Sequence, residues 1–82
     1  MINKLKEAPV KTIGTKQTLK ALDEDQVSLV FIAEDAEEHV TANLKEMCLK
    51  KGIEIVTVST MRELGDACKI QVGAASAAIL KS

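Results

Sequence analysis

The hydrophobic residues of this chain follow two spacings, one typical of strands and one typical of helices. The uninterrupted apolar run "VSLVFIA", 27–33, is typical of a central strand that is buried on both faces. The runs "IEIVTVS" at 53–59 and "AASAAIL" at 74–80 predict two further strands. A shorter strand is expected at 11–13, so the pattern predicts four strands in all.

Helical spacing fills the segments between these strands. We predict helices at 2–8, 15–23, 37–51 and 60–68, and Pro9 ends the first because proline cannot continue a helix. We expect the inward faces to carry Thr18, Leu19 and Leu22 in the second helix, Val40, Leu44, Met47 and Cys48 in the third, and Met61, Leu64 and Cys68 in the fourth.

Capping residues support these boundaries. Thr15 is predicted as the N-cap of the second helix, and Ser59 or Thr60 as that of the fourth, because a hydroxyl oxygen can accept a hydrogen bond from the first turn. Gly52 lies where a glycine commonly ends a helix in a left-handed conformation. The segment "KIQVG", 69–73, is expected to be a loop before the last strand.

The alternation of helices and strands predicts an α/β fold, a three-layer α/β/α sandwich with a four-stranded mixed sheet. A chain of 82 residues suffices for one modest core, so we expect a single domain over 1–82. No apolar run approaches the roughly 20 residues needed to cross a membrane, and no N-terminal signal pattern is present. We therefore expect a soluble, cytoplasmic protein with no membrane partner.

Composition excludes several kinds of site. Phe31 is the only aromatic residue, which excludes an aromatic platform for stacking nucleic-acid bases. Cys48 and Cys68 are expected to be buried thiols, because their spacing with His39 does not match a zinc site. His39 and the acidic segment at 34–38 are interpreted as solvated surface. No nucleophile stands beside a base, so we expect no enzyme, no metal and no cofactor.

Charge is distributed unevenly along the chain. The net charge is −1, yet residues 1–20 contain five lysines and one glutamate, whereas residues 21–50 contain eight acidic residues and two lysines. Such segregation allows one face of the folded protein to be basic while the whole chain is acidic. A basic face would suit a polyanionic partner.

The segment "IGTKQTLKAL", 13–22, contains an unfavourable charge pattern. Lys16 and Lys20 occupy the first turns of a helix without a carboxylate, although a helix start favours acidic residues and like charges four apart repel. A bound anion would offset that cost, and lysine and Gln17 can both hydrogen-bond base edges. Two interpretations remain: a solvated helix face, or a polar edge of Thr15, Lys16, Gln17 and Lys20 that contacts phosphates and bases.

Four segments in the same order, "IGTKQTLKAL", "LVFIAEDAEE", "CLKKGIEIVTVSTMRELGDACKI" and "VGAASAAIL", together carry a family resemblance. From about residue 9 to the end, the chain resembles the kink-turn-binding ribosomal proteins, the L7Ae and L30e group, and especially its small bacterial members. The resemblance implies a three-layer α/β/α fold that binds kink-turn RNA. A kink-turn is a duplex bent sharply at a bulge that is flanked by tandem sheared G·A pairs.

The resemblance also implies roles for the residues of the strand-to-helix motif. Gly14 would allow close approach of the backbone, Lys16 and Gln17 would face the guanines, and Lys20 would reach guanine or phosphate. Archaeal and eukaryotic members usually carry Asn-Glu where this chain has Lys16 and Gln17, so a carboxylate acceptor for guanine N–H groups is missing. The bacterial members resemble this chain at those positions.

A second family element is the loop of Ile70, Gln71, Val72 and Gly73, whose apolar side chains the resemblance puts near the bulged nucleotides. Ile70 and Val72 could instead be core residues at a loop edge. The acidic middle of the chain is expected to lie away from the RNA. We expect a monomer whose partner is structured RNA, a kink-turn in ribosomal RNA or a riboswitch; the alternative is a non-catalytic protein-interaction module on the same fold.

Overall fold

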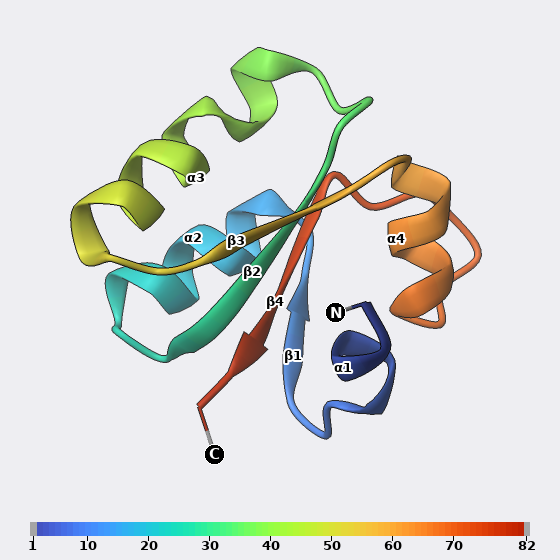
Figure 1. Ribbon diagram of the computed structural model, residues 1–82, viewed down its shortest axis with the longest axis horizontal. Helices are drawn as coiled ribbons and strands as arrows, with labels where there is room; N and C mark the ends of the chain where they lie inside the picture. The colour runs from blue at the N-terminus through green and yellow to red at the C-terminus, as the bar shows by residue number, and fades with distance from the viewer. Residues whose placement is uncertain (1, 82) are drawn as a thin grey trace.

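The computed structural model describes residues 2–81, and in that part of the chain four helices alternate with four strands (Figure 1). The elements are α1 (Ile2–Glu7), β1 (Lys11–Ile13), α2 (Thr15–Asp23), β2 (Val27–Ala33), α3 (Glu38–Lys51), β3 (Ile55–Val58), α4 (Met61–Ala67) and β4 (Ser76–Leu80). The predicted order and kind of every element are confirmed. The third and fourth strands are shorter than predicted, because residues 53–54 and 74–75 belong to the connections.

The four strands form one mixed sheet in the order β1-β4-β2-β3. The last strand, β4, lies between β1 and β2 and is antiparallel to both, whereas β2 and β3 are parallel. In the centre, Phe31 of β2 is opposite Ala77 of β4 and Val56 of β3. The mixed sheet and the central place of 27–33 are therefore as predicted.

Alternation along β2 produces the three layers, because successive side chains of a strand point to opposite faces. Leu29, Phe31 and Ala33 belong to one buried cluster, and Val30 and Ile32 belong to another. Helices α1 and α4 cover the first face, and α2 and α3 cover the second (Figure 1). The predicted α/β/α sandwich is confirmed.

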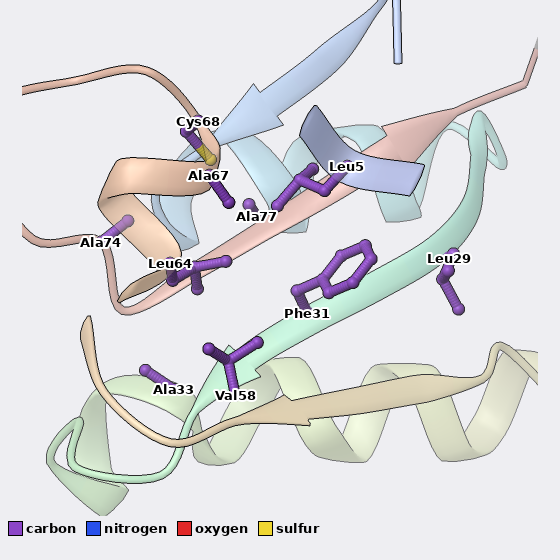
Figure 2. Packing of buried hydrophobic residues seen from close by; sticks show 10 residues of the cluster. All are labelled: Leu5, Leu29, Phe31, Ala33, Val58, Leu64, Ala67, Cys68, Ala74 and Ala77. Atoms are coloured by element: carbon purple, nitrogen blue, oxygen red, sulfur yellow. The ribbon is translucent and has the colours of Figure 1, made fainter. Parts of the chain in front are cut away.

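The core between the sheet and helices α1 and α4 surrounds the single aromatic ring (Figure 2). Phe31 is completely buried, as are Leu5 from α1 and Leu64 from α4. On the other face, the cluster includes Leu44 and Cys48 of α3, both completely buried. Leucine and alanine thus supply most of the packing that aromatic residues provide in other domains.

Two helix boundaries confirm the predicted caps. The Thr60 hydroxyl accepts a hydrogen bond from the Glu63 N–H group at 3.0 Å, which fixes the start of α4. Gly52 ends α3 in a left-handed conformation with φ of 68°. Helix α3 itself is rotated from the predicted orientation: Val40 is 39% exposed, and Thr41 takes the inward position beside Leu44.

The two cysteines are free and buried, as predicted, and the structure places them on opposite faces of the sheet. Burial disfavours the charged thiolate and raises the pKa of both the Cys48 and the Cys68 thiol. Both side chains therefore serve as small apolar core residues. Across residues 2–81, no helix has the length and apolar character needed to cross a membrane.

Candidate nucleic-acid interface

The turn between β1 and α2 depends on the backbone freedom of Gly14. Its φ of 94° and ψ of 155° lie in a region that side-chain-bearing residues rarely adopt. Its N–H group donates to the Ser76 carbonyl at 2.8 Å, and its carbonyl accepts from the Thr18 N–H group at 3.1 Å. A Cβ atom built on Gly14 would meet no protein atom within 4 Å, so the space beside this backbone is open.

Hydroxyl groups fix the turn to its surroundings. Thr15 Oγ1 and Ser76 Oγ share a hydrogen bond of 2.8 Å, and so do Thr12 Oγ1 and Thr18 Oγ1. Thr18 Oγ1 also lies 2.8 Å from the Gly14 carbonyl oxygen. Thr18 and Ser76 are completely buried, so these bonds are shielded from water and hold the start of α2 firmly.

The prediction that Thr15 caps α2 is wrong. Gly14 is the N-cap, no side chain caps the helix, and Thr15 is its first residue. The Thr15 hydroxyl is engaged by Ser76 instead, because β4 brings that side chain beside the turn. The first N–H groups of an α-helix have no intrahelical partner, so the start of α2 keeps its capacity to bind an anion.

The side chains predicted to contact a polyanion all face solvent. Lys16, Gln17 and Lys20 are exposed, and the first turn of α2 contains no acidic residue. Within residues 2–81, neither Lys16 nor Lys20 forms an ion pair. Lys16 therefore stands uncompensated at the positive end of the α2 dipole, and Lys20 lies one turn further along, in the last turn of the helix.

The loop 70–75 meets this turn through β4. The Ala75 carbonyl accepts from the Ala33 N–H group at 2.9 Å, and the next residue, Ser76, bonds both Gly14 and Thr15. The loop and the start of α2 therefore lie at the same end of the sheet, the upper end in Figure 1. The structure brings together the two segments that the sequence predicted separately.

The four loop residues differ in burial, which answers the question of their role in part. Ile70 is half-buried and packs against the core with Phe31 and Leu64, so it has the packing role. Val72 is 70% exposed, and Gln71 and Gly73 are also exposed. Val72 is therefore a surface residue and is free to contact a partner.

Two acidic residues of the middle of the chain, Glu34 and Asp35, also lie at this end of the sheet. Glu34 follows β2 directly, and its N–H group donates to the Val58 carbonyl at 2.7 Å. Asp35 Oδ1 accepts from the Met61 N–H group at 2.7 Å and so caps the first turn of α4. Asp25, by contrast, is at the opposite end, where its pairing with Lys51 lowers the carboxyl pKa.

The sequence did not reveal the residues whose hydrogen bonds hold the interface in place. Ser76 and Asp35 act through partners that are distant in sequence, 61 positions away for Thr15 and 26 for Met61, whereas Thr12 bonds Thr18, six positions away in the next element. The one available signal was the buried position of Thr18 on the predicted inner face of α2, where a polar side chain needs a partner.

Two open hollows lie on the surface formed by residues 2–81. A groove of about 470 Å³ between α2 and α3 includes Lys20, and a larger hollow of about 750 Å³ lies at the opposite end of the sheet near Pro9 and Leu80. His39 lines neither of them; it is exposed beside Glu37 at 3.3 Å. Among residues 2–81, no three potential ligands from His, Cys, Asp and Glu gather at a metal site.

Comparison with known proteins places the chain in a family. The sequence model of one protein family, the Ribosomal protein L7Ae/L30e/S12e/Gadd45 family, matches residues 1–82. The chain belongs to this family. A family relative named as an RNA-binding protein, from Caldanaerobacter subterraneus subsp. tengcongensis, is 56% identical over 70 residues, which cover 85% of each chain. Another, from Bacillus pumilus, is 44% identical over 78 residues, 95% of each chain.

A solved structure extends the likeness to three dimensions. The 15.5 kD RNA-binding protein of Giardia lamblia superposes on this chain with a TM-score of 0.88 at 29% identity. The match covers 99% of this chain and 71% of that protein. The α/β/α sandwich with its mixed sheet is thus the fold of an L7Ae-family member.

Proposed function

We propose that this L7Ae-family protein binds RNA, recognises kink-turns and stabilises their bent conformer. One observation carries the proposal: Lys16, Gln17 and Lys20 project, without acidic partners, from a rigid helix start that adjoins the loop bearing Val72. The named RNA-binding relatives support the choice of partner. The protein would act as a binding module of the cytoplasm, as a monomer and without catalysis.

Each part of the edge has chemistry suited to a distorted duplex. Lysine ammonium groups and free N–H groups of α2 would bind phosphates and the acceptor atoms of guanine. Gln17 can both donate and accept, so it can hydrogen-bond the edges of G·A pairs. Open space beside Gly14 would admit a base or the sugar–phosphate backbone, and Val72 would contact unstacked nucleotides.

The protein would select the kinked conformer rather than force the bend. A free kink-turn exchanges between extended and bent forms, and a ligand that binds only the bent form shifts that equilibrium. The hydrogen-bonded turn of Gly14, Thr15 and Thr18 supports this mechanism, because a preorganised surface loses little entropy on binding. Ribosomal RNA and riboswitches both contain such motifs and are the proposed targets.

The proposal is tested by measuring affinity for two RNA duplexes that differ only at the G·A pairs. Fluorescence anisotropy should show tight binding to the kink-turn and a loss of at least about 30-fold when both pairs become Watson–Crick pairs, because contacts at each altered pair are worth roughly 1–3 kcal/mol. Affinity should fall with salt on a log–log slope of about −2, one unit for each of Lys16 and Lys20.

Equal affinity for both duplexes would show non-specific binding and refute kink-turn recognition. No binding to either would favour a protein-interaction module on the same fold. A much steeper slope would mean that further lysine or arginine side chains contact phosphates. The proposed interface of Lys16, Gln17 and Lys20 would then be incomplete.

A further inference from the structure

Gly65 of α4 lies against the backbone of the loop that carries Val72. A Cβ atom added to Gly65 would overlap the carbonyl oxygen of Val72 and come within 3.1 Å of the Gly73 Cα atom. These are backbone atoms and cannot rotate away as the end of a side chain can. Any residue other than glycine at this position must therefore displace the loop or the helix.

The loop follows α4 closely on both sides of this contact. The Ile70 N–H group donates to the Gly65 carbonyl at 3.1 Å, and the Ala74 N–H group donates to the Met61 carbonyl at 3.0 Å. A Cβ atom on Gly73 would lie 3.1 Å from the Met61 Cβ atom. Two glycines, one on each segment, thus permit the backbones of the loop and α4 to pack directly together.

Gly65 is unfavourable for the helix that contains it, because only proline is a poorer helix former than glycine. It is buried, so solvent contact offers no explanation for it either. Because Gly65 has no side chain, the backbone of the loop can lie close to α4. The distance between the loop and α4 sets how far the exposed side chain of Val72 extends from the surface. Ser76 then connects the loop to Thr15 and the start of α2.

We propose that Gly65 is a positioning residue for RNA binding. Its missing side chain lets the loop sit low on α4, so that Val72 and Lys16 can reach the same RNA. This inference rests on the proposed kink-turn function and adds to it a residue that does not itself touch the RNA. Gly73 supports the same geometry from the loop side.

The test is a double-mutant cycle between Gly65→Ala and Val72→Ala, with kink-turn affinity as the readout. Gly65→Ala should weaken binding by roughly tenfold, which corresponds to about 1.4 kcal/mol. In the Val72→Ala background, where the loop no longer offers that side chain, the same change should have less than half this effect on affinity. A residue with a merely structural role would produce the same loss in both backgrounds.

Cys48→Ala is the matched control. Cys48 is completely buried on the other face of the sheet, so its truncation lowers stability without moving the loop. Stability is measured by urea unfolding, and binding is measured where every variant is folded. The control should retain the affinity of the unaltered protein even if it is as unstable as Gly65→Ala.

Gly73→Ala keeps the inference testable if Gly65→Ala does not fold. Its added methyl would lie 3.1 Å from the Met61 Cβ atom and 3.3 Å from the Met61 carbonyl carbon, a tight contact but not the overlap found at Gly65, so a smaller loss that is again coupled to Val72 is expected. Additive effects in both cycles would overturn the positioning role while the unaltered protein still binds the kink-turn. If the unaltered protein does not bind the kink-turn, the proposed function fails, and this inference fails with it.

Discussion

The two segments of the candidate interface are held in place by different kinds of interaction. The start of α2 is polar and is fixed by hydroxyl groups, through the pairs Thr12–Thr18 and Thr15–Ser76. The loop 70–75 presents an apolar tip and is fixed by direct backbone packing at Gly65. The difference teaches that the charged surface is held by side-chain hydroxyl pairs behind it, whereas the apolar tip is held by backbone hydrogen bonds to α4 and by the close approach that Gly65 permits.

The largest effect should come from removing a charge from the polar segment. Lys16→Ala or Lys20→Ala should weaken kink-turn binding by roughly 1–3 kcal/mol, because each lysine would contact guanine or phosphate. Thermal stability should be unchanged or slightly higher, since the two lysines are four residues apart on one helix and repel each other. Anisotropy titration and thermal unfolding measure the two quantities on the same samples.

Lys81→Ala is the charge control for these variants. Lys81 is exposed and follows β4 at the end of the sheet away from Ser76. Its loss should leave kink-turn affinity within about 0.5 kcal/mol. An equal loss for Lys81→Ala would mean that overall charge, rather than the start of α2, determines binding.

The second prediction concerns a variant that removes the buried hydrogen bonds holding the start of α2. Thr18→Val keeps the shape of the side chain but leaves the Thr12 hydroxyl without its partner, so the free energy of unfolding should fall by about 1–3 kcal/mol. Urea unfolding measures the change. Thr57→Val, at an exposed position of β3, is the matched control and should change stability by no more than about 0.5 kcal/mol.

An unchanged stability for Thr18→Val would mean that the hydroxyl pairs do not hold the turn. The contrast between the polar and the apolar segment would then rest on surface chemistry alone.

The third prediction distinguishes the roles of Ile70 and Val72, the two larger apolar side chains of the loop. Val72→Ser should weaken RNA binding by about 1 kcal/mol and leave stability unchanged, because its side chain is already mostly in water. Ile70→Ala should do the reverse and lower stability by about 1–2 kcal/mol, since Ile70 is half-buried against the core. If both variants lost stability alike, Val72 would be a core residue and not part of the interface.

The smallest expected effect concerns Lys69, which lies between the end of α4 and the loop 70–75. Lys69 has a φ of 64°, a left-handed conformation that is unfavourable for any residue with a Cβ atom. Lys69→Gly should therefore raise the free energy of unfolding by about 1 kcal/mol. Lys45→Gly, on an exposed turn inside α3, should lower it by a similar amount. A loss of stability in Lys69→Gly would contradict the assignment of strain.

Periodicity along the chain was sufficient to predict the order of elements and the layers. The apolar run 27–33 could only be satisfied between two helical layers, and the predicted inner positions Thr18, Leu22 and Leu44 are buried. Val40 and Thr41 show the limit of the method. Both lie at the edge of the same helical stripe, and the choice between them depends on how α3 rests on the sheet.

The interface was predictable as a set of surface residues and not as a geometry. Lys16 and Lys20 stood out because two like charges four residues apart, with no carboxylate in the first turn, are unfavourable in a helix. Gln17 stood out because its amide can hydrogen-bond base edges. The N-cap prediction for Thr15 was wrong because a threonine that follows a glycine is compatible both with an N-cap and with the first residue of a helix. Its partner, Ser76, joins it through the order of strands in the sheet, which no local pattern reveals.

The most direct test of the account is a measurement of RNA shape. A kink-turn duplex with a fluorophore at each end is titrated with the protein at fixed salt, and the end-to-end distance is read by energy transfer. The account predicts that the kink-turn compacts, that its Watson–Crick counterpart does not, and that Lys16→Ala shifts the midpoint to about tenfold or more higher protein concentration. Binding without compaction, or equal compaction of both duplexes, would contradict selection of the kinked conformer.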